Sequence, residues 1–114
     1  MSYQPEAGDL IWTDFDPRIG REQSGRRPAL VLSAKAFWLA SGFAIVCPIT
    51  SKVRPFGSSV LLPEDSAVTG EVLTSQVRSI DTKARPIAFA ECVAPASVLE
   101  EVRAKLAVLI GLEA

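Results

Sequence analysis

The sequence predicts an α+β fold, in which a small curved sheet or barrel carries one packed helix. Two observations lead to this prediction. Short apolar runs punctuated by Gly and Pro fill residues 10–92, and a helical pattern follows them only at the C-terminal end. Because helices do not alternate with the strands, the pattern disfavours an α/β fold. The chain has 114 residues, 48% of them apolar, so we expect residues 1–114 to form one domain with its own core.

The N-terminal part of the chain predicts three strands. Residues 10–15 mix β-branched and aromatic side chains, and residues 29–32 form a short apolar run typical of a strand buried on both faces. Residues 43–49 form the third strand, in which Pro48 marks the end or an edge position. Between the last two strands, residues 34–40 suit a short helix or turn.

The remainder predicts shorter strands and a final helix. Residues 60–62 and 71–74 are short strands separated by a turn region, and a further extended segment is expected within residues 80–92. The helix begins near Ser97, whose spacing to Glu100 is that of a capping box, and Pro95 suits the first turn or the position just before it. Its apolar stripe has helical spacing and comprises Val98, Leu99, Val102, Leu106, Leu109 and Ile110.

The composition removes several classes of chemistry. Without any histidine, a Ser-His-Asp triad, a paired-histidine ribonuclease mechanism and an ordinary catalytic zinc site are excluded. Cys47 and Cys92 lack the spacing of a metal or redox motif, so we expect two reduced core thiols. No apolar run approaches the ~20 residues of a membrane span, and the N-terminus does not resemble a signal peptide. We therefore expect a cytoplasmic protein that needs no metal and no other cofactor.

The charges are unevenly distributed, although the net charge is only −1. Residues 18–54 contain seven Lys and Arg residues and one Glu, so this stretch carries +6. A locally basic face can bind phosphates on a chain that is nearly neutral as a whole. Solvated loop charges are the alternative interpretation.

Two loops contain groups that could act on a phosphate. In the first, Arg27 opens a buried strand and precedes a proline, so its backbone is held while its guanidinium can reach into a groove. Pairing with Glu22, to brace the loop, is the alternative. In the second, Thr50 and Ser51 follow a strand, where hydroxyls often only cap a turn. Because the two strands are consecutive, Arg27 and Thr50 could converge on one phosphate.

The aromatic residues divide into two groups. We expect Trp12 in the core, because it lies within the first predicted strand. Trp38 and Phe56 lie near loops and could equally pack or stack on bases, an interaction worth ~1–3 kcal/mol per base.

Four motifs in order along the chain resemble the MazF/PemK toxin family. They are residues 8–17 (GDLIWTDFDP), 20–33 (GREQSGRRPALVLS), 47–51 (CPITS) and 76–81 (QVRSID). The PemK/Kid branch places an arginine and an aspartate at the positions that Leu73 and Ser75 hold here. The resemblance is therefore to the MazF-type branch.

This resemblance implies a fold, an activity and partners. The implied fold is a small SH3-like β-barrel, PemK/CcdB-like, with a C-terminal amphipathic helix. The implied protein is the toxin of a type II toxin–antitoxin system, a homodimer inhibited by a cognate antitoxin with an acidic, flexible C-terminal segment. The implied activity is a metal-independent, sequence-specific endoribonuclease that cleaves single-stranded mRNA. Attack of a ribose 2′-hydroxyl on the adjacent phosphate would leave a 2′,3′-cyclic phosphate and a 5′-hydroxyl.

The same resemblance implies roles for individual residues. Arg27 matches the catalytic arginine of the family, Thr50 the catalytic threonine, and Glu22 a loop glutamate beside them that could orient Arg27. The residues expected to contact RNA are Arg26, Ser51, Lys52, Arg54, Phe56, Gln76 and Arg78.

A second function class stays open at this point. The same barrel could be a non-catalytic module, either a CcdB-like gyrase poison or a nucleic-acid-binding domain, because fold does not settle function. A binding module would have no need to bring Arg27, Thr50 and Glu22 together, so their placement discriminates between the two classes.

Overall fold

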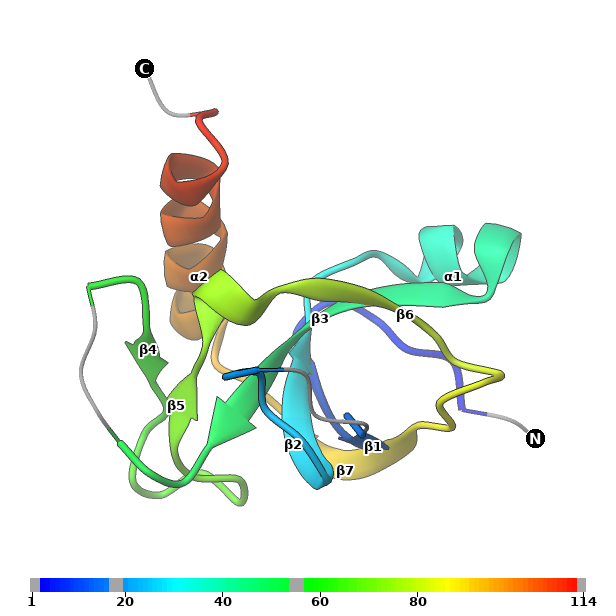
Figure 1. The fold of residues 1–114 in the computed structure, drawn as a ribbon, viewed down its shortest axis with the longest axis horizontal. Coiled ribbons are helices and arrows are strands. Elements are labelled where there is room, and N and C mark those ends of the chain that lie inside the picture. Colours follow the sequence, from blue (N-terminus) through cyan, green and yellow to red (C-terminus); the bar gives the residue numbers. More distant parts are fainter. Residues whose placement is uncertain (1–2, 17–19, 54–56, 113–114) are drawn as a thin grey trace.

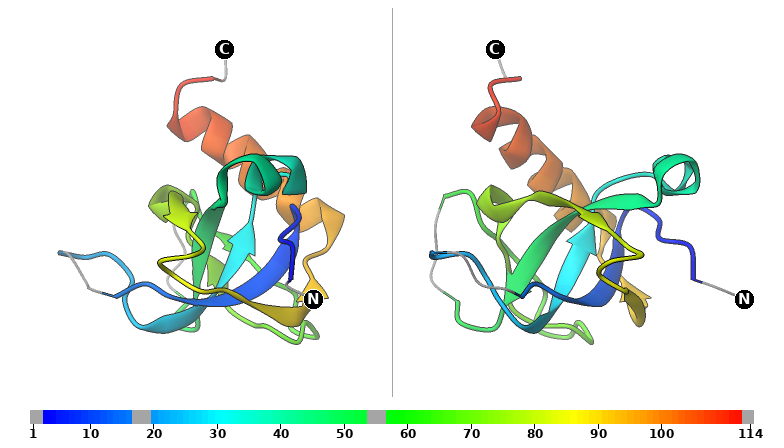
Figure 2. Two further views of the ribbon diagram at one scale, coloured as in Figure 1. Left: turned by 90° about the vertical axis from the view of Figure 1, so that its right-hand side faces the viewer. Right: turned by 45° about the vertical axis from the view of Figure 1, so that its right-hand side comes forward.

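The chain folds into a strongly curled antiparallel sheet with a long helix packed at one end. The computed structural model describes residues 3–16, 20–53 and 57–112. Figures 1 and 2 show the curled sheet, with the C-terminal helix standing on it. The elements in chain order are β1 (Asp9–Asp14), β2 (Arg26–Val31), α1 (Lys35–Ser41), β3 (Phe43–Thr50), β4 (Val60–Leu61), β5 (Glu71–Val72), the short 3-10 helix η1 (Thr74–Gln76), β6 (Arg78–Asp81), β7 (Ala88–Val93) and α2 (Ala96–Leu109).

The strand β3 organises the sheet. Across the described residues the strand order is β4-β5-β3-β2-β1-β7, and β6 also pairs with β3. The first half of β3 pairs with β6, from Phe43 to Val46, and its end pairs with β5, at Ile49 and Thr50. On its other edge β3 pairs with β2, with Ala29 opposite Pro48. This arrangement confirms the α+β class and the curled sheet that the sequence predicts.

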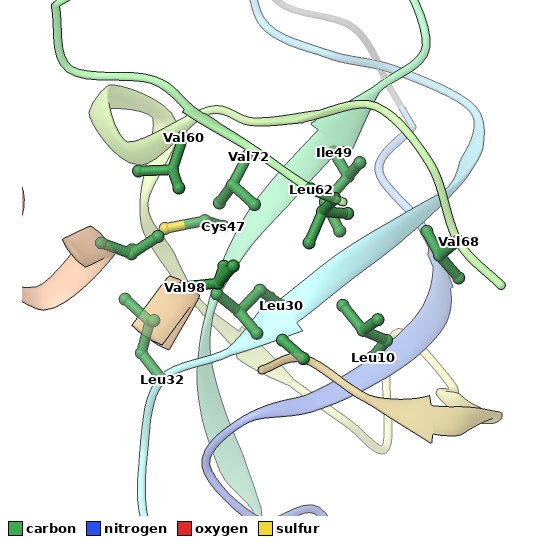
Figure 3. Packing of buried hydrophobic residues seen from close by; sticks show 12 residues of the cluster. Leu10, Leu30, Leu32, Cys47, Ile49, Val60, Leu62, Val68, Val72 and Val98 are labelled. Atoms are coloured by element: carbon green, nitrogen blue, oxygen red, sulfur yellow. The ribbon is translucent and has the colours of Figure 1, made fainter. Parts of the chain in front are cut away.

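Two hydrophobic clusters form because alternate side chains of each strand point to opposite faces. Leu10, Leu30 and Cys47 belong to the first cluster, which Val98 and Val102 of α2 complete. Figure 3 shows the side chains of this cluster gathered between the strands and the helix. The second cluster lies on the other face and comprises Ile11, Phe15, Ala29, Val31, Ala44, Val46 and Ile80.

The extended segment expected within residues 80–92 is two strands rather than one. The strands β6 and β7 are separated by a turn, in which the N–H of Arg85 donates to the carbonyl of Asp81 at 2.8 Å. The helix α1 is confirmed; it ends at Gly42, whose φ of 77° is the left-handed conformation that favours glycine at a helix end.

The start of α2 differs from the predicted capping box. The helix begins at Ala96, Pro95 is its N-cap, and no side-chain hydrogen bond caps it. Because proline has no N–H and its fixed φ suits a helix start, the boundary lies before Ser97 and leaves that residue inside the first turn. The Pro95 carbonyl accepts from the N–H of Val98 at 2.9 Å.

Three predictions about burial are wrong in part. In the apolar stripe of α2, Val98 and Val102 are buried, but Leu109 and Ile110 are 48% and 59% exposed because the helix extends past the sheet. Trp12 is half-buried rather than in the core, and the guanidinium of Arg26 lies over its ring. Cys47 is fully buried, and burial raises the pKa of its thiol to about 12, whereas Cys92 is only half-buried.

No helix in the part of the chain that the structure describes is long and apolar enough to cross a membrane.

Candidate active site

The register of three strands places Arg27, Thr50 and Glu71 side by side. The pairing of β2 with β3 reaches Ala29 opposite Pro48, and two residues further along each strand Arg27 and Thr50 both line one groove. On the other edge of β3, Thr50 is paired with Glu71. Side chains directly opposite one another in an antiparallel sheet project from the same face. The three side chains therefore form a row across the ends of β2, β3 and β5.

A polar groove of about 610 Å³ opens over this row. Its walls come from the loop before β2, the end of β3, the strand β5 and the helix η1. The lining residues are Arg21, Glu22, Gln23, Ser24, Arg27, Thr50, Lys52, Glu71, Leu73, Ser75 and Gln76. The groove thus brings together all three residues that the sequence nominates for catalysis, together with Lys52 and Gln76 from the nominated RNA contacts.

Arg27 is held by the loop that precedes it. Its Nε donates to the carbonyl of Ser24 at 2.7 Å, and its side chain is half-buried. This bond uses one of the five N–H donors of the guanidinium and fixes the direction of the planar group. Within the described chain no ion pair joins Arg27 to Glu22, so the bracing contact expected from the sequence is made by a backbone carbonyl instead.

Thr50 is buried, with 6% of its surface exposed, at the last position of β3. Its Oγ1 accepts from the N–H of Lys52 at 3.1 Å, which closes the turn that follows the strand. An oxygen that accepts this bond keeps its own O–H to donate. The hydroxyl therefore caps a turn and also faces the groove, so the two interpretations of Thr50 are compatible.

Gln76 joins the two walls of the groove. Its Oε1 accepts from the N–H of Gln23 at 3.0 Å, across 53 positions of sequence. The loop before β2 is also fastened to the end of β1, since the N–H of Phe15 donates to the carbonyl of Gly25 at 2.9 Å. These two bonds fix the segment that carries Glu22 and the partner of Arg27.

Other nominated residues lie elsewhere. The guanidinium of Arg26 lies 5.8 Å from the centre of the Trp12 ring, and that of Arg78 lies 5.7 Å from the Phe15 ring. Neither residue lines the groove, and neither does the exposed Ser51. Arg54 and Phe56 lie outside the described residues.

Trp38 belongs to the fold rather than to the groove. Its Nε1 donates to Thr82 Oγ1 at 2.9 Å, and Thr82 Oγ1 donates in turn to the carbonyl of Gly42 at 2.8 Å. This chain of bonds fastens α1 to the turn after β6.

Six of the eleven residues that line the groove are not among the site residues predicted from the sequence. The missed residues are Arg21, Gln23, Ser24, Glu71, Leu73 and Ser75. The sequence contains one signal for Glu71, which is a charged residue at the start of a short strand that is otherwise largely apolar. It is 3% exposed. Among the described residues, no group of three or more His, Cys, Asp or Glu side chains gathers that could hold a metal ion.

Comparison with known proteins assigns the chain to a class. The chain belongs to the family of PemK-like, MazF-like toxins of type II toxin–antitoxin systems, whose family model matches residues 6–110. Among particular relatives, it is 40% identical over 109 residues to the endoribonuclease toxin MazF of Escherichia coli K12, covering 96% of each chain. It is 47% identical over 85 residues to the endoribonuclease toxin ChpB of the same strain, covering 70% of this chain and 72% of ChpB.

Solved structures agree with this assignment. The crystal structure of MazF from Deinococcus radiodurans superposes with a TM-score of 0.91 at 44% identity, covering 96% of this chain and 99% of that one. A MazE–MazF complex from the same organism superposes with a TM-score of 0.84 at 41% identity, covering 96% and 98% of the two chains. The implied family and fold are therefore confirmed.

Proposed function

We propose that this protein is the toxin endoribonuclease of a type II toxin–antitoxin system, and that it cleaves single-stranded mRNA at short sequences without a metal ion. The observation that carries the proposal is the groove in which Arg27, Thr50 and Glu22 meet. Family membership and relatives named as endoribonucleases support the same activity. A purely binding module would not require a guanidinium, a hydroxyl and a carboxylate around one groove.

The groove suggests how the strand would be cut. The ribose 2′-oxygen attacks the adjacent phosphorus and loses its proton, while the 5′-oxygen of the next nucleotide leaves and gains one. The products carry a 2′,3′-cyclic phosphate and a 5′-hydroxyl. Arg27 stabilises the negative charge that grows on the phosphorane oxygens, because its guanidinium is already oriented by Ser24 and needs little reorganisation.

Thr50 and Glu22 complete the set. The buried hydroxyl of Thr50 donates to a phosphate oxygen and so positions the phosphorus beside Arg27. Glu22 lies in the same loop as Ser24, the residue that holds Arg27, and we assign it the role of orienting the guanidinium when RNA is bound. Lys52 and Gln76 line the groove and contact the flanking nucleotides.

Two protein partners belong to this proposal. Complexes of related toxins with their antitoxins support a cognate antitoxin, whose acidic, flexible C-terminal segment would fit the cations Arg21, Arg27 and Lys52 of the groove. The exposed apolar end of α2 supports a homodimer, since Val108, Leu109 and Ile110 are 61%, 48% and 59% exposed. We place the protein in the cytoplasm, where mRNA is its substrate, and treat residues 1–114 as one toxin domain.

Cleavage of a long mixed-sequence RNA tests the proposal. We expect defined cuts that persist in EDTA, with ends that polynucleotide kinase labels directly because they carry 5′-hydroxyls. Arg27→Ala should lower the cleavage rate about 10²–10³-fold, since it removes the group aimed at the developing charge. Lys83→Ala, which removes one positive charge from the exposed turn after β6, is the matched control and should cleave like the parent.

Three results would contradict the mechanism. They are cleavage that stops when a chelator is added, fragments with 5′-phosphate ends, and an Arg27→Ala variant that folds like the parent and cleaves as fast. Binding of RNA without any cut would favour a non-catalytic module.

A further inference from the structure

Asp16 lies outside the groove, but its carboxylate is bonded to the peptide that holds Arg27. Asp16 Oδ1 accepts from the N–H of Gly25 at 2.7 Å. This N–H and the carbonyl of Ser24 belong to one peptide group, and that carbonyl accepts from Arg27 Nε, also at 2.7 Å. Asp16 is exposed and does not line the groove, so the proposed mechanism gives it no role.

A single peptide group transmits the effect of Asp16 to Arg27. A peptide group is planar and trans, so its C=O and N–H point in opposite directions. A hydrogen bond that fixes the N–H of Gly25 therefore also fixes the direction of the Ser24 carbonyl. With the N–H directed to Asp16, the carbonyl is directed to Arg27 Nε. The carboxylate thus influences the direction of the guanidinium through the backbone.

The backbone at Gly25 would not hold this peptide by itself. Its φ is +77°, and glycine populates positive and negative φ about equally. A Cβ added at Gly25 would meet nothing within 4 Å, so close packing does not hold the backbone there. The bond from the N–H of Phe15 to the carbonyl of Gly25 fixes the following peptide group rather than this one. Rotation of the Ser24–Gly25 peptide is therefore opposed by its own hydrogen bonds, to Asp16 and from Arg27.

Asp16 is itself fixed at the end of β1. Its N–H donates to Asp14 Oδ1 at 2.9 Å, in a turn that this side chain closes. Arg85 Nη1 donates to the carbonyls of Asp14 and Asp16, at 2.9 and 2.5 Å, from the turn between β6 and β7. A group held by supporting bonds of this kind can keep a second group in one orientation. Asp16 therefore offers a stationary acceptor to the N–H of Gly25.

We propose that Asp16 is a positioning residue for RNA cleavage. Its carboxylate holds the Ser24–Gly25 peptide, and the carbonyl of Ser24 then directs the Arg27 guanidinium toward the phosphate. This inference rests on the proposed ribonuclease function and deepens it. Asp16 acts as a hydrogen-bond acceptor, so the reaction does not need its negative charge. Without the bond, the guanidinium keeps its charge but loses the orientation that stabilises the transition state.

Two substitutions at Asp16 separate the acceptor from the charge. Asp16→Ala removes both, and we expect kcat for cleavage of a defined RNA to fall about 10–100-fold, with KM within about twofold of the parent. Asp16→Asn loses the charge but keeps Oδ1 as an acceptor, so its kcat should stay within about threefold of the parent value. Asp65→Ala is the matched control, because it removes an exposed carboxylate outside the groove and should cleave like the parent.

The Nε–H of Arg27 reports the same contact without any cleavage. In a nitrogen–proton correlation spectrum, this resonance is assigned as the arginine Nε–H signal that is missing from Arg27→Lys. We expect the Nε–H to exchange slowly with solvent in the parent and in Asp16→Asn, and about tenfold faster or more in Asp16→Ala. Circular dichroism checks that each variant is folded.

A double substitution tests whether Asp16 acts through Arg27. In an Arg27→Ala background the guanidinium that Asp16 positions is absent, so adding Asp16→Ala should lower the cleavage rate by no more than about twofold. A role confined to the stability of the fold would instead add its full effect in both backgrounds. Single-turnover assays with excess enzyme measure these low rates.

Each outcome decides for or against this role. A parent-like kcat in Asp16→Ala would overturn the inference, and so would a full additional loss in the Arg27→Ala background. If Asp16→Ala does not fold, Asp16→Asn decides alone, because a large loss of kcat or of Nε–H protection in this folded variant contradicts the role. A parent that cleaves no RNA contradicts the proposed function, whereas exchange of the Arg27 Nε–H still tests the contact.

Discussion

At the scale of single residues, Gly70 determines where Thr50 can lie. Its φ is +124°, and a Cβ added there would stand 2.3 Å from the carbonyl oxygen of Thr50 and 3.3 Å from a methyl carbon of Ile49. A contact of 2.3 Å with backbone cannot be relieved by rotating a side chain. The absence of a side chain at Gly70 therefore lets β5 approach β3 closely enough to set Glu71 beside Thr50.

Gly70→Ala should for this reason harm both folding and cleavage. We expect a loss of about 1–3 kcal/mol in the free energy of unfolding, from the left-handed φ and the displaced backbone, and a fall in the cleavage rate because Thr50 moves. Urea unfolding and an RNA cleavage assay measure the two effects. Gly57→Ala is the control, since a Cβ at Gly57 would meet nothing within 4 Å. Equal stability of Gly70→Ala and the parent would contradict this account.

The residue scale also shows what the sequence could predict about the site. Arg27 and Thr50 could be nominated because each stands at the end of a strand, and the register confirms that both strands lead to one groove. Charge alone does not distinguish Arg26 and Arg78, which lie outside the groove, from the arginines that line it. Their guanidinium groups are directed to aromatic rings by the pleat of β2 and by the pairing of β6 with β3.

At the scale of elements, the helix α1 is capped by a residue distant in sequence. Ala34, its N-cap, provides no side-chain bond. Instead Glu6 Oε1 accepts from the N–H of Lys35 at 3.1 Å and from the N–H of Ala7 at 3.0 Å. The hydrogen bond from the N–H of Ala7 has the larger effect and that from Lys35 the smaller, and together they lower the pKa of Glu6 below its ordinary value of 4.5. The N-terminal segment is therefore coupled to α1 through one carboxylate.

This cap should make stability depend on pH. A carboxyl group whose pKa is lower in the folded state stabilises the fold above its unfolded pKa, and the contribution is lost as the pH falls through the folded value. Glu6→Gln should therefore unfold at a lower urea concentration than the parent at about pH 7, and the difference should shrink as the pH is lowered below about 4. A difference that is constant over this range, or that grows in acid, would contradict the role of Glu6.

Elements with a strong local signal are the ones that the sequence predicts well. The helix α2 is confirmed by its apolar stripe, and β1 to β3 are confirmed because each contains an apolar run, although β2 begins at Arg26, three residues before the run predicted at residues 29–32. The helix η1 was missed, since its three residues are too few to show a period. At the start of α2 the position predicted for Pro95 is confirmed, because Pro95 is the N-cap, whereas the predicted capping box is wrong, because no side chain caps the helix.

At the scale of the whole molecule, the apolar end of α2 is the largest feature that the fold itself does not explain. Leu112 is 75% exposed, and Leu32, Ile45, Leu106 and Ile110 surround a groove of about 250 Å³ beside it. Exposed apolar patches of this kind usually mark interaction surfaces. The patch shares none of the lining residues of the polar groove.

The homodimer in the proposed function should depend on this surface. We expect the parent to sediment as a dimer at micromolar concentration and Ile110→Asp to sediment as a monomer, because a charge would be buried in an apolar contact. Leu39→Asp is the control, since Leu39 is 60% exposed on α1 and does not line the apolar groove. A parent that sediments as a monomer, or a Leu39→Asp variant that dissociates instead, would contradict this assignment.

The triple pairing of β3 has a consequence for how a strand of RNA could enter the groove. Across the described residues β3 is bonded to β2, β5 and β6, and Thr50 at its end is paired with Glu71 of β5. The bond between Gln23 and Gln76 joins the loop before β2 to η1, which are two walls of the groove. The two walls of the groove are therefore bonded to each other, and an RNA strand that forces them apart must break this bond.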